Sequence, residues 1–485
     1  MFSAFLSSGF FLGWSLGAND ASNVFGTAVG SGMIRFRTAA IYCSIFVILG
    51  AVISGAGASH TLGKLGAVNA IAGAFIVAFS AALSVYLMTN LRFPVSTSQA
   101  IVGAIIGWNF FSGSVTDMGA LTKIASTWVL CPLLSGGFAI MLYLVSSFSI
   151  NHFRIHMFKL DSLTRYSLFF AGIFGSYALG ANNIANVMGV FVPVAPFESL
   201  YFFGVRFSPA QQLFFLGGIA IAIGVFTYSK RVMMTVGSGI YNLTPVAATV
   251  VVWSHSAVLF LFSSQSLEAW LQNHGLPTIP LVPVSSSQAI VGAVIGIGLL
   301  KGGRGIKWKT VAGITSSWVT TPIIAAVVCF VSLFFLQNVF QQQTYKPVEY
   351  SITKGAMDKI IEAHIPHMKL QQLMWETYPN SREFSKAIDD HTDLKKNEIN
   401  QLLEIAELFE IEISNSSFVK LDPGKFTTAH YLALAKLEGR VFQHKWEIRE
   451  ALEEISTDFK YKLGQKKWNH KVDERFQYLL NRLQN

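Results

Sequence analysis

Apolar residues dominate the first 340 positions and fall into long runs separated by short polar breaks. From about residue 346 the pattern changes to Lys- and Glu-rich segments in which Leu and Ile recur with helical spacing. Most apolar runs are long enough to cross a hydrocarbon core about 30 Å thick as a helix, but those after Pro94 and Pro283 are too short to cross alone. This pattern predicts an all-α polytopic membrane protein with a soluble α-helical C-terminal domain. The runs cover roughly residues 2–17, 38–58, 66–89, 100–112, 124–148, 166–180, 211–228, 240–264, 289–300 and 310–337.

A polar stretch follows the first apolar run, where the rest of a membrane span is expected: Gly17-Ala-Asn-Asp-Ala-Ser-Asn-Val-Phe-Gly26. Its Asp20 is the only charged side chain in residues 1–34. A carboxylate inside the membrane is costly, so it usually faces an ion, a partner group or water. Glycines and asparagines surround Asp20, and this composition predicts a broken helix whose freed backbone lines a polar cavity.

Three motifs occur twice in the same order. The stretch at 17–26 recurs as Gly180-Ala-Asn-Asn-Ile-Ala-Asn-Val-Met-Gly189, the segment 93–107 recurs at 282–296, and 126–132 recurs at 316–322. The first pair is 163 positions apart and the later pairs are 189 and 190 apart, so the second half carries an insertion of about 26 residues in the 193–210 loop and beyond. Ordered recurrence predicts two repeats. Short interrupted segments at matching places predict broken helices and re-entrant hairpins around a transport site.

The predicted organisation has four parts. Residues 1-150 form a first transmembrane repeat, 151-165 a connecting loop, and 166-340 a second transmembrane repeat. Residues 346-485 form a helical domain with a regulatory or dimerising role. The chain is 52% hydrophobic and 13% charged, which excludes an ordinary soluble enzyme and places the protein in a plasma or inner cell membrane as a multi-pass protein.

The basic residues lie in the predicted membrane loops. Residues 1–345 hold 15 Lys and Arg against 5 Asp and Glu, so the excess indicates topology rather than binding to nucleic acid. The loop 301–309 carries four basic residues and no acid, which predicts a cytoplasmic position, and loop 149–165 is expected on the same side. If 310–337 crosses once, the C-terminal domain lies outside; a cytoplasmic domain requires 310–337 to form a hairpin.

The sequence offers no catalytic constellation. The three cysteines fall in apolar runs and are expected to be packing residues, and the histidines of the C-terminal domain lack metal-ligand spacing. No nucleophile–base pair is visible. The protein is therefore not expected to be an enzyme, and no cofactor or metal is expected beyond a coupling Na⁺ or H⁺.

The Pro-Val-Ser motifs place hydroxyl and amide side chains at the start of a helix, directly after a proline. In one interpretation these side chains only satisfy helix-end N–H groups, because the spacing is that of a capping box. In the other, free N–H groups, the helix dipole and the hydroxyls bind an oxyanion without Lys or Arg. The candidate anion-binding residues are Ser96, Thr97, Ser98, Gln99, Ser285, Ser286, Ser287 and Gln288.

The Gly-Ala-Asn motifs supply carboxylate and amide oxygens, which are ligands that hard cations such as Na⁺ prefer. The alternative is that the small residues and asparagines allow close helix packing with inter-helix hydrogen bonds. A buried dianion beside Asp20 needs compensating cations or protons, since unpaired buried charge costs several kcal/mol. This argument predicts symport. The candidate coupling-ion ligands are Asp20, Asn19, Asn23, Asn182, Asn183 and Asn186.

At these motifs the chain resembles the inorganic phosphate transporter (Pit) family. The matching marks are residues 17–31, the Pro-Val-Ser motifs at 94–98 and 283–287, and the run 230–245. The resemblance covers residues 1–337 and implies inverted repeats, a midplane phosphate site, cation symport and a homodimer in the lipid bilayer. Some members with similar motifs carry sulfate.

The chain departs from the family pattern at several positions. The family commonly has Ser-Thr-Thr-His where this chain has Gln99 and Gln288 in the fourth place, and many members have an acid at the position of Asn183. The family glutamates are absent, since residues 38–58 and 211–264 contain no Glu or Asp. These losses bear on the number and identity of the coupling ions.

Three functions remain in competition. The first is import of inorganic phosphate, with arsenate as a mimic, by secondary active transport with alternating access. The second is a sulfate permease of the same architecture. The third is an anion-binding sensor that signals through residues 346–485.

Overall fold

The computed structural model describes residues 2–66, 68–90, 95–202, 205–236, 243–413, 421, 426–462 and 466–483. Pro94 and residues 237–242 of the family motifs therefore lie outside the described residues. The chain divides into two compact units. The first comprises Met1–Phe111 and Thr116–Lys346, and the second comprises Ser112–Val115 and Pro347–Asn485.

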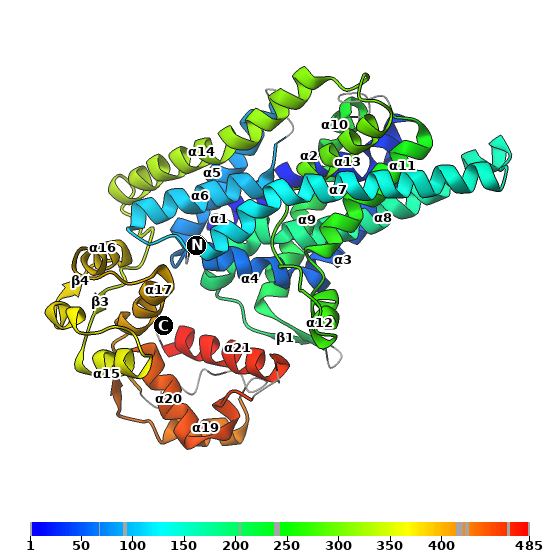
Figure 1. Ribbon diagram of the computed structural model, residues 1–485. Helices are drawn as coiled ribbons and strands as arrows, with labels where there is room; N and C mark the ends of the chain where they lie inside the picture. The colour runs from blue at the N-terminus through cyan, green and yellow to red at the C-terminus, as the bar shows by residue number, and fades with distance from the viewer. Residues whose placement is uncertain are drawn as a thin grey trace. The chain divides into compact units, whose positions relative to one another are not determined.

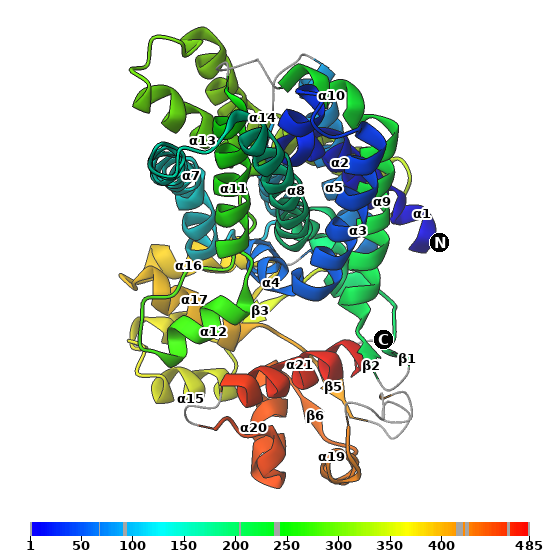
Figure 2. The same cartoon turned by 90° about the vertical axis from the view of Figure 1, so that its right-hand side faces the viewer.

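The first unit is built almost entirely from helices (Figures 1 and 2). A short antiparallel pair, β1 (Leu200–Phe202) and β2 (Val205–Phe207), follows the 3-10 helix η1 (Gly189–Val194). The helices of the first half are α1 (Phe2–Phe5), α2 (Ser7–Gly30), α3 (Phe36–Ser54), α4 (Ala56–Leu65), α5 (Ile71–Asn90), α6 (Thr97–Ser112) and α7 (Met118–His152). Those of the second half are α8 (Met157–Met188), α9 (Pro209–Thr227), α10 (Ser229–Val236), α11 (Pro245–Leu261), α12 (Gln265–Asn273), α13 (Ser286–Leu300) and α14 (Trp308–Asn338).

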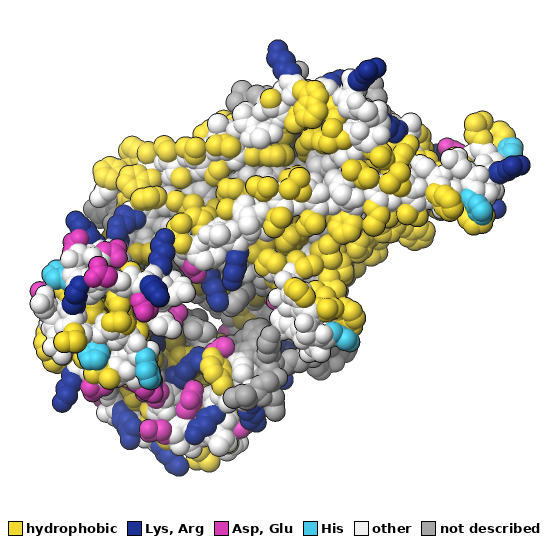
Figure 3. Space-filling view, in the orientation of Figure 1, with side chains coloured by type: hydrophobic (Ala, Val, Ile, Leu, Met, Phe, Trp, Pro, Cys, Tyr) yellow, Lys and Arg dark blue, Asp and Glu magenta, His cyan; other side chains and the backbone are white. Residues whose placement is uncertain are grey.

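Among the described residues, six helices are long and apolar enough to cross a membrane: α3, α5, α7, α8, α9 and α14. Helices α11 and α12 are together long and apolar enough for a span, but they meet at 66°, as in a broken span or a re-entrant loop. Helix α14 exposes Val319, Ile323 and Val327 at a spacing of four residues, each more than half exposed, as expected for a lipid-facing stripe. Figure 3 shows hydrophobic side chains covering the long helices of this unit. The protein is a multi-pass, all-α membrane protein.

The polar stretch at 17–26 does not break its helix. Helix α2 runs without interruption from Ser7 to Gly30, and α8 likewise continues through its own copy of the motif to Met188. The prediction of a break at this place was wrong, because Gly17 serves close packing instead. A Cβ added to Gly17 would lie 2.0 Å from the carbonyl oxygen of Ile221 on α9. Only glycine allows two helix backbones to approach this closely.

The two halves make the same close contacts, each with the other half. A Cβ on Gly180 of α8 would lie 2.0 Å from the carbonyl oxygen of Val47 on α3, which repeats the contact of α2 with α9. A Cβ on Gly103 of α6 would lie 2.1 Å from the Pro322 carbonyl oxygen of α14. A Cβ on Gly292 of α13 would likewise lie 2.1 Å from the Pro132 carbonyl oxygen of α7. The halves are therefore interlocked through four tight helix pairs, α2–α9, α3–α8, α6–α14 and α7–α13.

These contacts also show where the extra residues of the second half lie. Val47 and Ile221 are 174 positions apart, compared with 163 for the polar motifs and 189 for the Pro-Val-Ser motifs. Part of the extra length therefore precedes α9, where η1, β1 and β2 lie, and the remainder follows α9, where α10 and α12 lie.

Helix α14 is one continuous helix of 31 residues with Pro322 inside it. The hairpin considered for 310–337 is therefore not formed. If α14 spans the membrane, the chain leaves it on the side opposite to the basic loop at 301–307.

Within its described residues, the second unit holds two halves, each with an antiparallel strand pair and three α-helices. Strand β3 (Tyr350–Ser351) pairs with β4 (Thr377–Tyr378), and β5 (Ile411–Glu412) pairs with β6 (Val441–Phe442). Between the halves, His444 hydrogen-bonds Thr353 Oγ1 through Nε2 at 2.8 Å. No described helix of this unit meets the criteria for a membrane span. Its helices are α15 (Lys354–Glu362), α16 (Ser381–His391), α17 (Lys396–Ala406), α19 (Thr428–Ala435), α20 (Lys445–Ile455) and α21 (Lys466–Leu483), with the 3-10 helices η2 (Lys369–Leu373) and η3 (Thr457–Phe459).

Candidate functional site

The four predicted polar segments meet inside the first unit. They are the middle of α2, the C-terminal part of α8, and the starts of α6 and α13. All fourteen predicted site residues are described and buried, and none is more than 7% exposed. The structure therefore brings the two pairs of motifs together, and the arrangement is closed to solvent.

Hydrogen bonds join α2 to the start of α13 and α8 to the start of α6, in each case between the two halves. Asn23 on α2 donates from Nδ2 to Ser286 Oγ at the start of α13, at 2.9 Å. Asn186 on α8 donates from Nδ2 to Ser98 Oγ on α6, at 2.8 Å. Ser98 Oγ in turn donates to the carbonyl oxygen of Val284, at 3.0 Å. This bond links the start of α6 to the segment just before α13.

Asn182 braces the segment that leads into α13. Its Nδ2 donates to the Val282 carbonyl oxygen at 3.1 Å, and its Oδ1 accepts the Val284 N–H at 2.8 Å. This amide replaces the partners that an extended segment would find in a neighbouring strand. In the other half, Asn19 Nδ2 donates to the Val95 carbonyl oxygen at 3.5 Å, a weaker bond. Asn182 therefore fits the alternative interpretation, in which the asparagines of these motifs form hydrogen bonds between segments.

The starts of α6 and α13 are capped as the spacing predicts. Ser96 Oγ accepts the Gln99 N–H at 3.3 Å, and Ser285 Oγ accepts the Gln288 N–H at 3.2 Å. Neither helix supplies an acceptor for the N–H groups of the two residues that precede each Gln. Two positive helix ends thus point into one buried region.

Several buried polar atoms in this region have no hydrogen-bond partner among the described residues. Buried polar groups are normally paired, so such a concentration marks space that a ligand would satisfy. The set offers one hydroxyl, one amide N–H₂ group and three amide oxygens. The atoms are Thr97 Oγ1, Asn183 Nδ2, Asn186 Oδ1, Gln99 Oε1 and Gln288 Oε1.

Asp20 is buried beside this set at 2% exposure. Its Oδ1 accepts a hydrogen bond from Asn19 Nδ2 at 2.9 Å, and no ion pair to it is found within the described part of the chain. The equivalent position in α8 is Asn183, whose Oδ1 accepts from Asn186 Nδ2 at 3.0 Å. The site therefore contains a carboxylate from one half and a neutral amide from the other.

His255 in α11 is a further residue of this region that was not among those predicted from the sequence. This side chain is fully buried, and its Nε2 lies 2.9 Å from Ser286 Oγ. The signal was present, because His255 is the one ionisable side chain in the apolar run 245–261, the same criterion that singled out Asp20.

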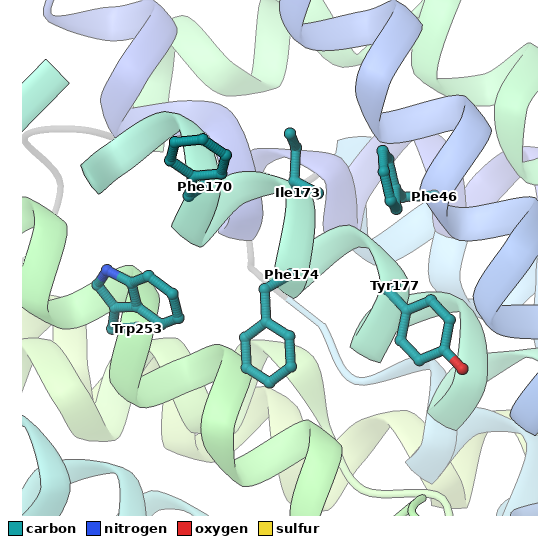
Figure 4. A pocket seen from close by; sticks show the side chains of 6 residues that line it. All are labelled: Phe46, Phe170, Ile173, Phe174, Tyr177 and Trp253. Atoms are coloured by element: carbon teal, nitrogen blue, oxygen red, sulfur yellow. The ribbon is translucent and has the colours of Figure 1, made fainter. Parts of the chain in front are cut away.

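A separate groove of about 390 Å³ opens between α3, α8 and α11 (Figure 4). Aromatic and aliphatic side chains line it. The hydroxyl of Tyr177 is bonded to Ser54, and the indole N–H of Trp253 donates to Ser167 Oγ, so their polar atoms are already paired. This groove offers an anion no donors and is distinct from the motif site.

Comparison with known proteins identifies the family. The model of the phosphate transporter family matches residues 16–159, 154–269 and 275–484. A Methanocaldococcus jannaschii protein described as a candidate phosphate permease is 28% identical over 66% of this chain and 93% of its own length. The sulfate permease CysP of Bacillus subtilis is 30% identical over 67% of this chain and 85% of its own length.

A solved structure, the sodium-dependent phosphate transporter, shares the fold. Its TM-score is 0.56 at 24% identity, and the match covers 69% of this chain and 99% of that one. These relatives are permeases and transporters, and the protein is accordingly not an enzyme. The paired motifs, their buried meeting point and the family match together establish that this chain belongs to the phosphate transporter family.

Proposed function

We propose that the protein is a secondary active transporter that imports inorganic phosphate by symport with Na⁺ or H⁺. The observation that carries the proposal is the buried region in which two helix N-termini, unpartnered polar atoms and one carboxylate meet without Lys or Arg. In this proposal the two halves are inverted repeats, and the site lies near the membrane midplane.

The anion is bound by hydroxyls and main-chain N–H groups. The candidates are the starts of α6 and α13, including Thr97 Oγ1, which lacks a partner among the described residues. Helix N-termini bind phosphate and sulfate in this way, because unsatisfied N–H groups and the dipole favour negative charge. A protonated phosphate also needs an acceptor for its O–H group, and the free amide oxygens of Gln99 and Gln288 can provide one.

The coupling ion is bound at Asp20. A dianion buried near this carboxylate would leave uncompensated charge, which costs several kcal/mol. Sodium prefers oxygen ligands, and the Asp20 carboxylate and the unpartnered Asn186 Oδ1 are buried oxygens of the kind that it binds. A proton on Asp20 would serve the same purpose. Because the neutral Asn183 occupies the equivalent position, we infer that the second half binds a cation only through amide oxygen.

A sulfate permease is the second candidate function. The relative from Bacillus subtilis named as a sulfate permease favours it, at 30% identity. Sulfate carries no O–H group at neutral pH, so it would leave the acceptor oxygens of Gln99 and Gln288 without a donor. An anion sensor that signals through residues 346–485 is the third candidate.

Uptake into liposomes that contain the purified protein tests these proposals. We expect accumulation of labelled phosphate under an imposed sodium or proton gradient, with excess unlabelled sulfate competing weakly. Asp20→Asn should abolish the gradient dependence, whereas Asn183→Ala should retain it. Preferred uptake of sulfate would favour the second function, and binding without net flux would favour the sensor. Phosphate uptake that depends on neither the sodium gradient nor the proton gradient would refute symport.

A further inference from the structure

Ser286 is held between two side chains from different helices. Its Oγ lies 2.9 Å from Asn23 Nδ2 of α2 and 2.9 Å from His255 Nε2 of α11. Ser286 is 2% exposed and His255 is fully buried, so water does not compete for these bonds. The equivalent residue in the first half is Thr97, whose Oγ1 has no partner among the described residues. The two halves therefore present their hydroxyls to the site differently.

The direction of the bond between His255 and Ser286 decides what Ser286 can offer a ligand. A serine hydroxyl has one hydrogen to donate and two lone pairs to accept. Asn23 Nδ2 can only donate, so it occupies one lone pair. If Ser286 donates to an unprotonated Nε2, its hydrogen is directed at the imidazole. If Nε2–H donates instead, both lone pairs are occupied and the hydroxyl hydrogen remains available.

An oxyanion favours the second arrangement. It is an acceptor and can take up only a hydrogen that the protein has not already used. Two donors to the oxygen of Ser286 also polarise its O–H bond, which strengthens the hydrogen bond that it donates. In this arrangement the buried Nδ1 of His255, which has no partner among the described residues, is an unpaired acceptor and not an unpaired N–H donor. Orphaned buried N–H groups are the rarer of the two.

We propose that His255 is a positioning residue of the anion site: its Nε2–H donates to Ser286 Oγ, so that the Ser286 hydroxyl hydrogen is directed at the bound oxyanion. His255 does not touch the anion and acts through Ser286. The inference rests on the proposed function, since the ligand class is the tetrahedral oxyanion that the transporter carries.

Uptake kinetics in liposomes test the proposal. His255→Leu removes the donor, and we expect the apparent KM for phosphate to rise about tenfold or more while the maximal rate per folded protein changes little, because a hydrogen bond to a charged group is weakened. His255→Gln restores a side-chain N–H donor and should recover most of the affinity. The matched control is Ser254→Ala on the same helix, whose buried hydroxyl donates to the Val250 carbonyl oxygen at 2.8 Å, and it should leave KM unchanged.

A double substitution separates positioning from general packing. Once Ser286→Ala has removed the hydroxyl, adding His255→Leu should produce no further rise in KM. If His255→Leu folds poorly, His255→Gln is compared with Ser286→Ala instead. His255→Gln should keep most of the affinity and of the thermal shift that phosphate induces, and Ser286→Ala should lose both. Wild-type protein that neither transports nor binds phosphate or sulfate overturns the proposed function and this inference together. An active wild type with an unchanged KM in His255→Leu, or an additive double variant, overturns this inference alone.

Discussion

Gly17 gives the most direct test of how the site is supported. The change Gly17→Ala places a methyl group 2.0 Å from the carbonyl oxygen of Ile221, whereas ordinary contact begins at 3.4 Å. Helices α2 and α9 must therefore separate locally by about 1.4 Å, the difference between these two distances. Asp20 lies less than one turn away on α2, so the displacement reaches the site.

Two opposing effects set the expected magnitude. Overpacking costs about 1–3 kcal/mol, while replacing a helical glycine with alanine gains up to about 1 kcal/mol. Gly26→Ala on the same helix isolates the gain, since its Cβ would meet nothing closer than 3.6 Å. We expect the free energy of unfolding of Gly17→Ala to be about 2 kcal/mol below that of Gly26→Ala. We also expect its coupled uptake to fall by about a hundredfold, as a displacement of about 1 Å can cause.

The assay combines chemical or thermal unfolding in detergent with phosphate uptake in liposomes for both variants. Gly180→Ala should behave like Gly17→Ala, because Gly180 makes the same contact with Val47 in the other half. Equal stability and equal uptake for Gly17→Ala and Gly26→Ala would show that the backbone approach does not support the site, and the reasoning would fail.

Three further predictions concern other parts of the chain. Thr97→Val keeps the shape of a buried side chain whose hydroxyl has no partner among the described residues, so the free energy of unfolding should not change. The apparent KM for phosphate should rise about tenfold, and an unchanged KM would remove Thr97 from the site. In sealed right-side-out vesicles, external protease should digest a C-terminal tag and spare a tag in loop 301–307, because α14 is one helix; the opposite result would reverse the orientation. His430 accepts the Thr427 N–H through Nδ1 at 2.9 Å, and burial followed by the charge of Arg475 lowers its pKa, so the unfolded chain binds the proton more readily. The stability of α19 should therefore fall as the pH drops below 6.5, the ordinary pKa of histidine. Hydrogen exchange of α19, corrected for intrinsic rates, measures this, and His430→Gln should remove the pH dependence. Equal pH dependence in both proteins would contradict the prediction.

Candidate site residues could be selected from the sequence because their chemistry conflicts with their surroundings. Polar residues within apolar runs, repeated in order, can be recognised without a structure, and the serine caps of α6 and α13 follow from local spacing alone. Their assembly and burial are structural findings, whereas their roles in transport remain proposals.

The remaining features depend on contacts between distant segments. The continuity of α2 could not be predicted, since a glycine that breaks a helix and one that admits a neighbouring backbone look alike in sequence. The partner of Gly17 is Ile221, more than 200 positions away. His255 was overlooked for a related reason, because its significance comes from Ser286 on another helix.

The four tight helix pairs also indicate where the molecule can move. Within each pair, backbone touches backbone at a glycine, so sliding of one helix along the other would bring a carbonyl oxygen against the next side chain. The bonds from Asn23 to Ser286 and from Asn186 to Ser98 join different pairs instead. These bonds are single hydrogen bonds to hydroxyls that an anion can also use. We therefore expect each pair to move as one body, with the Asn23–Ser286 and Asn186–Ser98 bonds at the boundaries where one pair can shift against another.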